Sequence, residues 1–330
     1  MVKNDFKIVT IGGGSGSSVL LHGLKNFTKN ITAIVTAADD GGGSGILRED
    51  LGMLPPGDIR SCLVALSNSE KEMADLMKFR FSESSGRLSG QSFGNIFLAA
   101  MSEIYKDFET GLKEASKVLA ITGKVLPMTL EDVTLYAKLE NGMVIEGESN
   151  ITFLARKEET KIDHVFLKPE IIRPPFESLD DINGADMIVL GPGSLYTSIM
   201  PNLLVKDLLK AIIDSKAIKV YILNIMTQAG ETIGYRAIDH IDAIYKHAGE
   251  NFLDYVIVNN KEIDERIKLK YKYKDKTEQI LLNDLEKKTI EARGIKVIED
   301  SLIEVKNDYV RHDANHLSRI LTDILQDNIK

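Results

Sequence analysis

A short β-branched run that ends in glycines and leads straight into a helical pattern is the strongest constraint on the fold of this chain. Residues 6–11, FKIVTI, have the composition of a buried parallel strand, and three glycines follow at 12–14. Apolar residues then recur at helical spacing in SSVLLHGLKNF, before a second strand pattern, ITAIVTA, at 31–37. A strand, a glycine turn, a helix and a second strand in succession predict a doubly wound α/β sheet.

The same alternation returns in the second half of the chain. It predicts a strand with a glycine turn at 185–194, strands at 219–227 and 254–260, and helices at 202–213 and 237–248. Between the halves, helices are expected around 59–79 and 95–119, followed by a β segment at 133–151 with a hairpin turn at Asn141–Gly142. We therefore expect one Rossmann-like domain over residues 1–330, with a mostly parallel sheet, helices on both faces, and 262–330 as a small β/α extension packed on it.

The segment RIKLKYKYKDK, residues 266–276, alternates apolar and basic residues with a period of two. That period predicts a strand with one apolar face and one basic face. Two interpretations remain open: an edge strand whose lysines block edge-to-edge pairing, or a strand that lines a ligand cleft. The chain then ends in a helical pattern that Asp313 is placed to cap.

Charge and cysteine content exclude several classes of protein. The formal net charge is −8, which argues against a general binder of nucleic acid or of anionic membranes. A single cysteine, Cys62, rules out an internal disulfide and a cysteine-rich metal site, and it is expected to pack in a helix. Since no apolar stretch reaches the ~20 residues of a membrane span, we expect a cytoplasmic protein without membrane insertion.

The stretch TAADDGGGSGILREDLGMLPPGDIR, residues 36–60, contains three acids among glycines. It has little helix or strand pattern before Pro56, and ordering such a polar segment is costly unless a ligand binds there. Asp40 and Asp58 could hold a magnesium ion that bridges phosphates, with Asp39 beside the ligand. Asp58 could instead cap a helix, and Arg60 could be either a phosphate clamp or a surface residue.

Glycine turns after strands provide candidate anion sites. GGGSGSS, residues 12–18, matches neither the dinucleotide fingerprint nor a Walker A loop, but its backbone N–H groups at a helix start would suit an anion. A bare β-α turn is the alternative interpretation. Because three such polar loops follow three strands, they indicate one crevice at a topological switch point. The candidate residues are Gly13, Gly14, Ser15 and Gly16 in the first loop, Gly193, Ser194, Tyr196, Thr197 and Asn202 in the second, Asn224, Thr227 and Gln228 in the third, and Asn95 at a separate helix start.

The motifs expected of common enzyme classes are missing from the sequence. None of the six histidines has an H-E-x-x-H context, and no serine stands in the register of a G-x-S-x-G elbow. A zinc hydrolase and a serine hydrolase triad are therefore not expected.

Taken together, these segments resemble the gluconeogenesis factor family, a branch of the group that includes 2-phospho-L-lactate transferase. The resemblance covers nearly the whole chain and rests on GGGSGSSVLLHGLK, ITAIVTAADDGGGSG, LPPGDIRSCLVAL, FGNIFLAA, GESNI, GPGSLYTSIMPNLLV, NIMTQAGET, DYVIVNN and YVRHD. One departure is Gln91, where a histidine is more usual in the family.

The resemblance implies a cytoplasmic protein that binds a nucleotide diphosphate, in this branch UDP-N-acetylglucosamine. The implied role is regulatory, in cell shape and envelope synthesis during gluconeogenic growth, with a homodimer and cell-wall-synthesis proteins as compatible partners. The transferase branch offers the alternative, a magnesium-dependent transferase of a phosphate-linked group in which the residues matching Asp40 and Asp58 hold the metal. The resemblance also places Tyr271 and Arg311 at the ligand, and no tightly held organic cofactor is expected.

Overall fold

The central sheet of the computed structural model, which describes residues 4–306 and 308–328, is parallel throughout. Its strands lie in the order β10-β9-β8-β7-β1-β2-β3. β1 has β2 on one side and β7 on the other, so the order reverses next to β1. Their bounds are β1 Asn4–Gly12, β2 Thr28–Val35, β3 Lys124–Pro127, β7 Met187–Leu190, β8 Ile218–Ile222, β9 Tyr255–Asn259 and β10 Lys296–Asp300.

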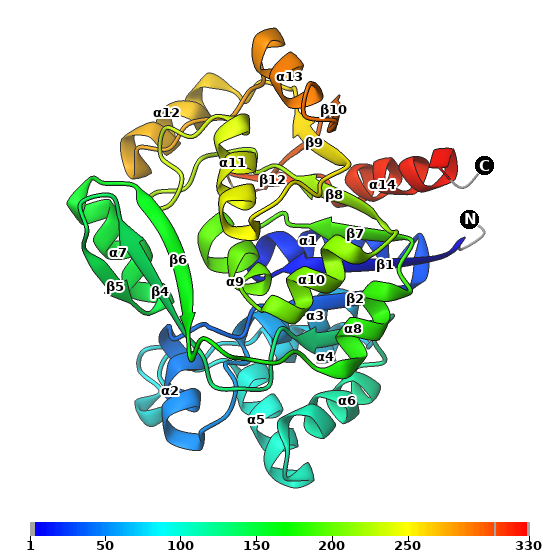
Figure 1. Cartoon of the computed structure of the whole chain (residues 1–330). Coiled ribbons are helices and arrows are strands. Elements are labelled where there is room, and N and C mark those ends of the chain that lie inside the picture. The colour runs from blue at the N-terminus through cyan, green and yellow to red at the C-terminus, as the bar shows by residue number, and fades with distance from the viewer. Residues whose placement is uncertain (1–3, 307, 329–330) are drawn as a thin grey trace.

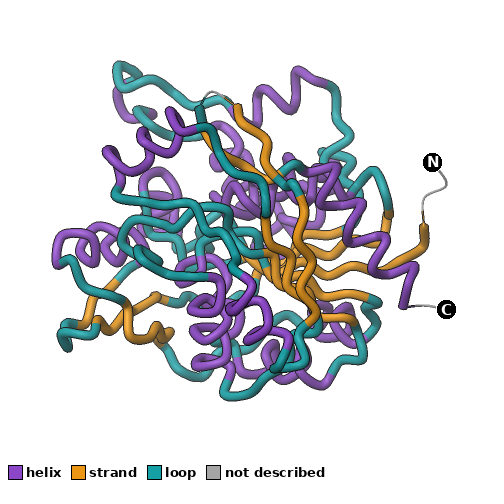
Figure 2. Tube along the Cα trace, turned by 90° about the horizontal axis from the view of Figure 1, so that it is seen from above, coloured by secondary structure: helices purple, strands orange, loops and turns teal. Residues whose placement is uncertain are grey.

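Helices cover both faces of this sheet, as expected for a doubly wound fold (Figures 1 and 2). Neighbouring residues of a strand belong to different cores: Ile8 packs with one cluster and Val9 with the other. The helices are α1 Gly14–Leu24, α2 Gly42–Leu51, α3 Gly57–Leu66, α4 Lys71–Lys78, α5 Phe93–Tyr105, α6 Phe108–Val118, α7 Glu148–Glu158, α8 Phe176–Asn183, α9 Met200–Leu203, α10 Lys206–Asp214, α11 Ala237–Ala248, α12 Glu265–Asp275, α13 Asp284–Glu291 and α14 Ala314–Asn328, with short turns at Gly86–Leu88 and Leu195–Ile199.

Two smaller sheets stand beside the central one. β4 (Thr134–Leu139), β5 (Val144–Glu146) and β6 (Ile162–Lys168) form an antiparallel sheet, whose first turn is the expected hairpin at Asn141–Gly142. β11 (Ile303–Lys306) and β12 (Tyr309–His312) form an antiparallel pair. The segment 262–330 also supplies β10 to the central sheet, and its helix α14 begins after Asp313, which accepts the backbone N–H of His316 as the sequence indicated.

The segment expected to be a strand at 266–276 is instead the helix α12, and the period-two prediction is wrong. Asp264 caps its start by accepting the N–H of Arg266, and Lys276 ends it in the left-handed conformation. Ile267 and Tyr271, four residues apart, face the same small apolar cluster, so the helical spacing decides which face packs. Lysine is compatible with a helix, and an alternating sequence does not by itself impose an extended backbone.

The glycine-rich stretch 36–60, where no regular structure was expected, contains the helix α2. Tertiary contacts stabilise this helix although its sequence is a poor helix former. A side chain at Gly45 would collide with the backbone of Asp40, so glycine allows the helix to fold back closely on the preceding turn. Arg48 anchors the helix through Asp132 at 2.9 Å and the carbonyl of Val133 at 2.6 Å.

Two further elements have other bounds than the sequence predicted. The helix expected at 202–213 is divided into α9 and α10, and the strand expected at 219–227 ends at Ile222. Residues 223–227 leave the sheet at its carboxyl edge. Most of them line the cleft described below.

Candidate functional site

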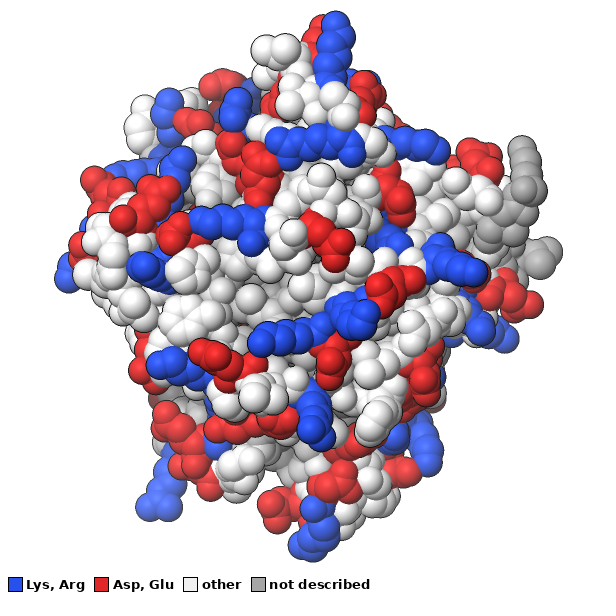
Figure 3. Space-filling view, in the orientation of Figure 1, with Lys and Arg blue, Asp and Glu red and all other residues white. Residues whose placement is uncertain are grey.

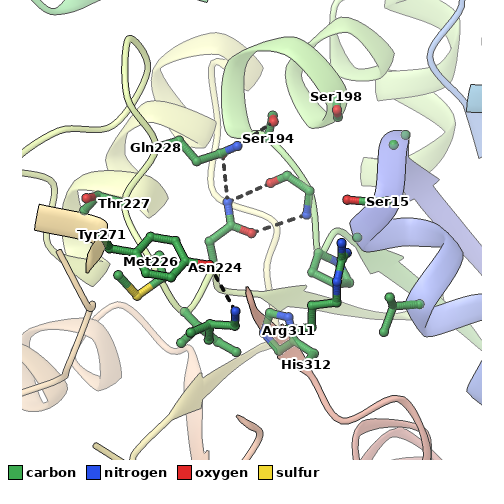
Figure 4. Close-up of a pocket in the computed structure, with 18 residues that line it drawn as sticks. Ser15, Ser194, Ser198, Asn224, Met226, Thr227, Gln228, Tyr271, Arg311 and His312 are labelled. Carbon is green, nitrogen blue, oxygen red and sulfur yellow. Dashed lines mark hydrogen bonds between the residues drawn. The ribbon is translucent and has the colours of Figure 1, made fainter. Parts of the chain in front are cut away.

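A cleft of about 260 Å³ opens at the carboxyl edge of the sheet, where β1 and β7 lie side by side and the strand order reverses (Figure 4). This is the position at which doubly wound folds bind ligands. Five segments meet there: the start of α1, the loop after β7, the loop after β8, helix α12, and strand β12. The lining residues are Gly13, Gly14, Ser15, Gly16, Val19, Pro192, Gly193, Ser194, Ser198, Asn224, Ile225, Met226, Thr227, Gln228, Tyr271, Val310, Arg311 and His312.

The start of α1 forms one wall of the cleft. Gly13 caps the helix without a side-chain hydrogen bond, so the first backbone N–H groups of the helix depend on other acceptors. A side chain at Gly16 would collide with the carbonyl of Pro192 and crowd the N–H of Gly193. The two glycine loops therefore approach each other closely, and glycine at position 16 is what permits it.

Asn224 fastens the loop after β8 to the loop after β7. Its amide nitrogen donates to the carbonyl of Gly193 at 2.8 Å, and its amide oxygen accepts the N–H of the same residue at 3.3 Å. The amide nitrogen also lies 3.3 Å from the Gln228 oxygen, and the Gln228 nitrogen donates to Ser194 Oγ at 2.7 Å. Figure 4 shows this chain of amides behind the cleft. With its amide used in this way, Asn224 positions the Gly193 backbone.

Helix α12 and strand β12 close the opposite side of the cleft. The Tyr271 hydroxyl accepts the backbone N–H of Val310 at 3.0 Å and so ties the helix to the strand. The next residue, Arg311, is half-buried and points into the cleft, and no carboxylate of the described residues pairs with it. An arginine in that position is free to bind an anion by its planar fork.

His312 is the second titratable residue of β12 in the cleft. Burial lowers the pKa of His312 to about 4, so the ring is neutral near pH 7. Its Nε2 donates to the carbonyl of Leu223 at 3.2 Å, which makes Nδ1 the acceptor nitrogen.

Acidic residues gather on the other side of the α1 start. Burial and the neighbouring Asp39 carboxylate raise the pKa of Asp58 to about 6, although Asp58 also accepts the N–H of Gly14. Burial, with the Asp39 and Asp58 carboxylates nearby, raises the pKa of Glu148 well above its usual value. Asp40 points elsewhere and accepts the N–H of Ser149 at the start of α7, at 2.9 Å.

These carboxylates fit part of a magnesium site. In the part of the chain that the structure describes, no group of three or more His, Cys, Asp or Glu side chains is arranged to hold a metal. Magnesium needs only one or two carboxylates when phosphate oxygens and waters complete its shell. Asp39 is the neighbouring carboxylate whose charge acts on Asp58, so these two are the residues that would hold such an ion. Asp40, which the sequence suggested for this role, is instead hydrogen-bonded to the start of α7.

Eleven of the nineteen residues singled out from the sequence line the cleft, from the three glycine-polar loops and the two C-terminal elements: Gly13, Gly14, Ser15, Gly16, Gly193, Ser194, Asn224, Thr227, Gln228, Tyr271 and Arg311. A twelfth, Asp58, accepts the N–H of Gly14. Asp39 and Asp40 belong to the acidic group described above, and the other five point away from the cleft. Arg60 points toward Ser92, with its Nη1 3.2 Å from the hydroxyl, and the buried amide of Asn95 donates to Ser44. Asn202 is completely buried and donates to Thr36 at 2.9 Å.

Tyr196 and Thr197 also turn away from the cleft. The Tyr196 hydroxyl bonds to that of Tyr235 at 2.7 Å, and the Thr197 hydroxyl donates to Glu231 at 3.1 Å. Glu231 also accepts the N–H of Tyr196 at 3.0 Å and so holds the turn that precedes α9. These residues support the second glycine loop from behind.

The sequence interpretation missed several residues at the site. Glu148 carries a signal in the sequence, since it belongs to the GESNI segment quoted above. His312 directly follows Arg311 and could have been included on that ground. Val19, Met226 and Ser198 had no signal beyond their nearness to the loops, because their placement depends on tertiary packing.

Comparisons with known proteins agree with this architecture. The family described as 2-phospho-L-lactate transferase CofD matches residues 8–303. A putative gluconeogenesis factor from Thermoanaerobacterium thermosulfurigenes is 57% identical over 98% of this chain and 98% of its own length. A gluconeogenesis factor from Bacillus subtilis is 46% identical over 97% of this chain and 98% of its own. A crystal structure of a protein from Bacillus halodurans superposes with a TM-score of 0.91 at 45% identity, covering 97% of this chain and all of that one.

Proposed function

Since this chain belongs to the 2-phospho-L-lactate transferase CofD family, with relatives named gluconeogenesis factor, we propose that it binds a UDP-sugar in the cleft and acts as a regulatory protein. The ligand implied by the resemblance is UDP-N-acetylglucosamine. The proposed role is cytoplasmic, in cell shape and envelope synthesis during growth on gluconeogenic carbon sources. No described helix is long and apolar enough to cross a membrane.

One observation supports the ligand class: two glycine loops meet at one side of the cleft, and Arg311, which pairs with no carboxylate of the described residues, lies at the other. The N–H groups at the start of α1 and around Gly193 favour a negative charge. Arg311 adds a full positive charge from β12. Two adjacent anion sites and a guanidinium suit a pyrophosphate, which carries two neighbouring negative groups, better than they suit a ligand with a single carboxylate.

The remaining walls suit the two ends of such a ligand. The tyrosine ring of Tyr271 offers an aromatic face for a base, while hydroxyls and amides at Ser194, Thr227 and Gln228 suit a sugar. His312 Nδ1 supplies an acceptor. These groups bind and orient, and none of them is paired as a nucleophile with its base, which supports a binder over an enzyme.

A general nucleic-acid role has less support. On the face shown in Figure 3, acidic and basic side chains are interspersed and no continuous basic surface appears. With the net charge of −8, this distribution favours a small-molecule ligand over a polyanion.

Calorimetry tests the proposal directly. We expect UDP-N-acetylglucosamine to bind with a larger affinity than NAD, and Arg311→Ala to weaken it by about 1–3 kcal/mol, the scale of a charged hydrogen bond. Arg319→Ala on the exposed side of α14 is the matched control and should bind as the original protein does. Absence of UDP-sugar binding, or equal loss in both variants, would contradict the proposal.

The cellular role has its own test. A Bacillus subtilis strain that lacks its gluconeogenesis factor is grown on a gluconeogenic carbon source and supplied with this chain. We expect the chain to restore normal cell shape and the Arg311→Ala variant to fail at equal protein level. Equal restoration by both would separate the cellular role from ligand binding.

The acidic residues favour a second candidate, a magnesium-dependent transferase of a phosphate-linked group. Asp39 and Asp58 lie beside the α1 start, where they would hold a metal next to a diphosphate. Bound there, the metal would neutralise charge on the phosphates, and the glycine loops would orient the reacting group. Formation of a phosphate-ester product during hours of incubation with a nucleotide diphosphate and an acceptor hydroxyl would favour this candidate.

A further inference from the structure

A second cavity, of about 370 Å³, lies behind the wall formed by residues 227–235 and the end of α12. Its apolar lining comes from Ala155 and Ile233, and Ile233 keeps 37% of its surface exposed. Charged side chains of both signs surround this lining: the cations Arg156, Lys161 and Lys276 and the carboxylates Glu159, Glu231 and Asp275. Two of the carboxylates, Asp275 and Glu159, pair with Arg156 and Lys276. An exposed apolar side chain and the remaining cation, Lys161, therefore have the composition of a site for a small amphipathic anion.

Of these cations, Lys161 is the one available to pair with such an anion. Its ammonium lies 5.4 Å from the centre of the Tyr235 ring, and no carboxylate among the described residues is within salt-bridge distance of it. By contrast, Arg156 pairs with Asp275 at 3.3 Å and Lys276 pairs with Glu159 at 2.5 Å. Both pairs are exposed, so exchanging a partner there costs little.

Those two ion pairs join α7 to α12. Arg156 also donates to the carbonyl of Lys274 at 2.9 Å, at the end of α12. Figure 1 shows α12 beside the small sheet that carries α7. Helix α12 thus has Tyr271 in the cleft and, one turn later, Asp275 and Lys276 in the second cavity.

The loop after β8 divides in the same way. Thr227 and Gln228 line the cleft, and Gly230 and Ile233 line the second cavity. The loop has little freedom to absorb a change at one side, because a side chain at Gly230 would collide with the carbonyl of Thr152. A ligand on either side therefore packs against the same two segments.

We propose that the second cavity is a binding site for a small amphipathic anion, whose charged group pairs with Lys161 and whose apolar part covers Ile233. Its occupancy changes the affinity of the cleft through α12 and the loop after β8, and by linkage the cleft ligand changes the affinity of the cavity by the same factor. The site itself is independent of the function proposed above; only the coupling rests on it.

Anilinonaphthalene sulfonate, an aromatic anion, is the probe for the site. Titrated into the protein without nucleotide, it should give a saturable fluorescence increase with one site per chain. Lys161→Glu and Ile233→Asp should each weaken its binding by about tenfold. Lys157→Glu, an exposed residue of α7 outside the cavity, is the matched control and should leave binding unchanged.

Unchanged binding in both cavity variants, or an equal loss in the Lys157→Glu control, would overturn the site. Competitive displacement of the probe by UDP would also overturn it, because it would place the probe in the cleft. Thermal melts of all three variants verify that a loss of binding is not a loss of folding, and the two positions are exposed enough that at least one variant should fold.

The coupling is tested by titrating UDP-N-acetylglucosamine with and without saturating probe. We expect its dissociation constant to change by about threefold or more. If the dissociation constant is the same with and without the probe, the coupling is overturned, while the proposed second site is unaffected. If the nucleotide does not bind at all, the proposed function fails, while the probe titration still decides the second site.

Discussion

The hydroxyl of Tyr271 on α12 accepts the backbone N–H of Val310 on β12, and this bond of 3.0 Å closes the cleft opposite the glycine loops. The two residues are 39 positions apart in the sequence. The bond holds the helix against the strand that carries Arg311, so the aromatic ring and the guanidinium occupy one wall in a fixed arrangement.

A phenylalanine at position 271 distinguishes the contribution of the hydroxyl from that of the ring. Tyr271→Phe keeps the ring in the cleft and leaves the Val310 N–H without its acceptor. We expect the free energy of unfolding to fall by about 0.5–1.5 kcal/mol, as measured by urea denaturation. Tyr273→Phe, on the same helix but 83% exposed, should change nothing, and an equal loss in both variants would argue against the bond.

The raised pKa of Asp58 predicts a stability that depends on pH. The native carboxyl titrates at about 6, against an ordinary 3.8, so the folded protein holds this proton more tightly than the unfolded chain. Its contribution is therefore present below pH 4 and is lost as the pH rises through 6. The difference of about two pH units corresponds to at most about 3 kcal/mol.

Asp58→Asn should remove this loss, because an amide oxygen still accepts the Gly14 N–H but carries no charge. In urea unfolding without metal or ligand, we expect the variant to be more stable than the original protein at pH 8, by about 1–3 kcal/mol, and nearly equal at pH 4. The opposite dependence is expected at Asp107, whose pKa is lowered by its hydrogen bonds to Thr110. A pH-independent difference at Asp58 would contradict the assignment.

The sequence predicted the sheet and the position of the cleft because both depend on local patterns. The β-branched runs and glycine turns around Gly13 and Gly193 are readable without tertiary contacts, and parallel strands bring their ends to one edge. The seven-stranded parallel sheet, with helices on both faces, confirms the predicted fold class.

The parts that the sequence did not predict depend on long-range packing. Alternation at 266–276 suggested a strand, but the apolar cluster around Ile263 and Ile267 selects a helix. Asn202 belongs to the same polar segment after β7 as Ser194, yet it is buried in α9 against Thr36, 166 residues away. No local pattern distinguishes a polar side chain that supports a loop from one that faces a ligand.

The Asn224 amide predicts an effect on binding that does not require contact with the ligand. Asn224→Ala removes two hydrogen bonds to Gly193, which join the loops after β7 and β8, and one to Gln228 within the loop after β8. We expect weaker UDP-sugar affinity by about 1–2 kcal/mol, together with faster hydrogen exchange at the Gly193 N–H. Asn141→Ala in the exposed hairpin is the control. Weaker affinity without faster exchange would instead indicate direct contact with the ligand.

The close approach of the two glycine loops predicts that Gly16 tolerates no side chain. In Gly16→Ala the new methyl group would collide with the carbonyl of Pro192, so the loops must separate. We expect a loss of about 1–3 kcal/mol in stability, the usual cost of overpacking, and a loss of UDP-sugar affinity because the backbone N–H groups no longer converge. Ser15→Ala, the neighbouring position in the same turn, removes only a hydroxyl and should fold normally. Calorimetry and urea unfolding of both variants check this, and a Gly16→Ala protein with normal affinity and stability would mean that the loops are not held together in solution.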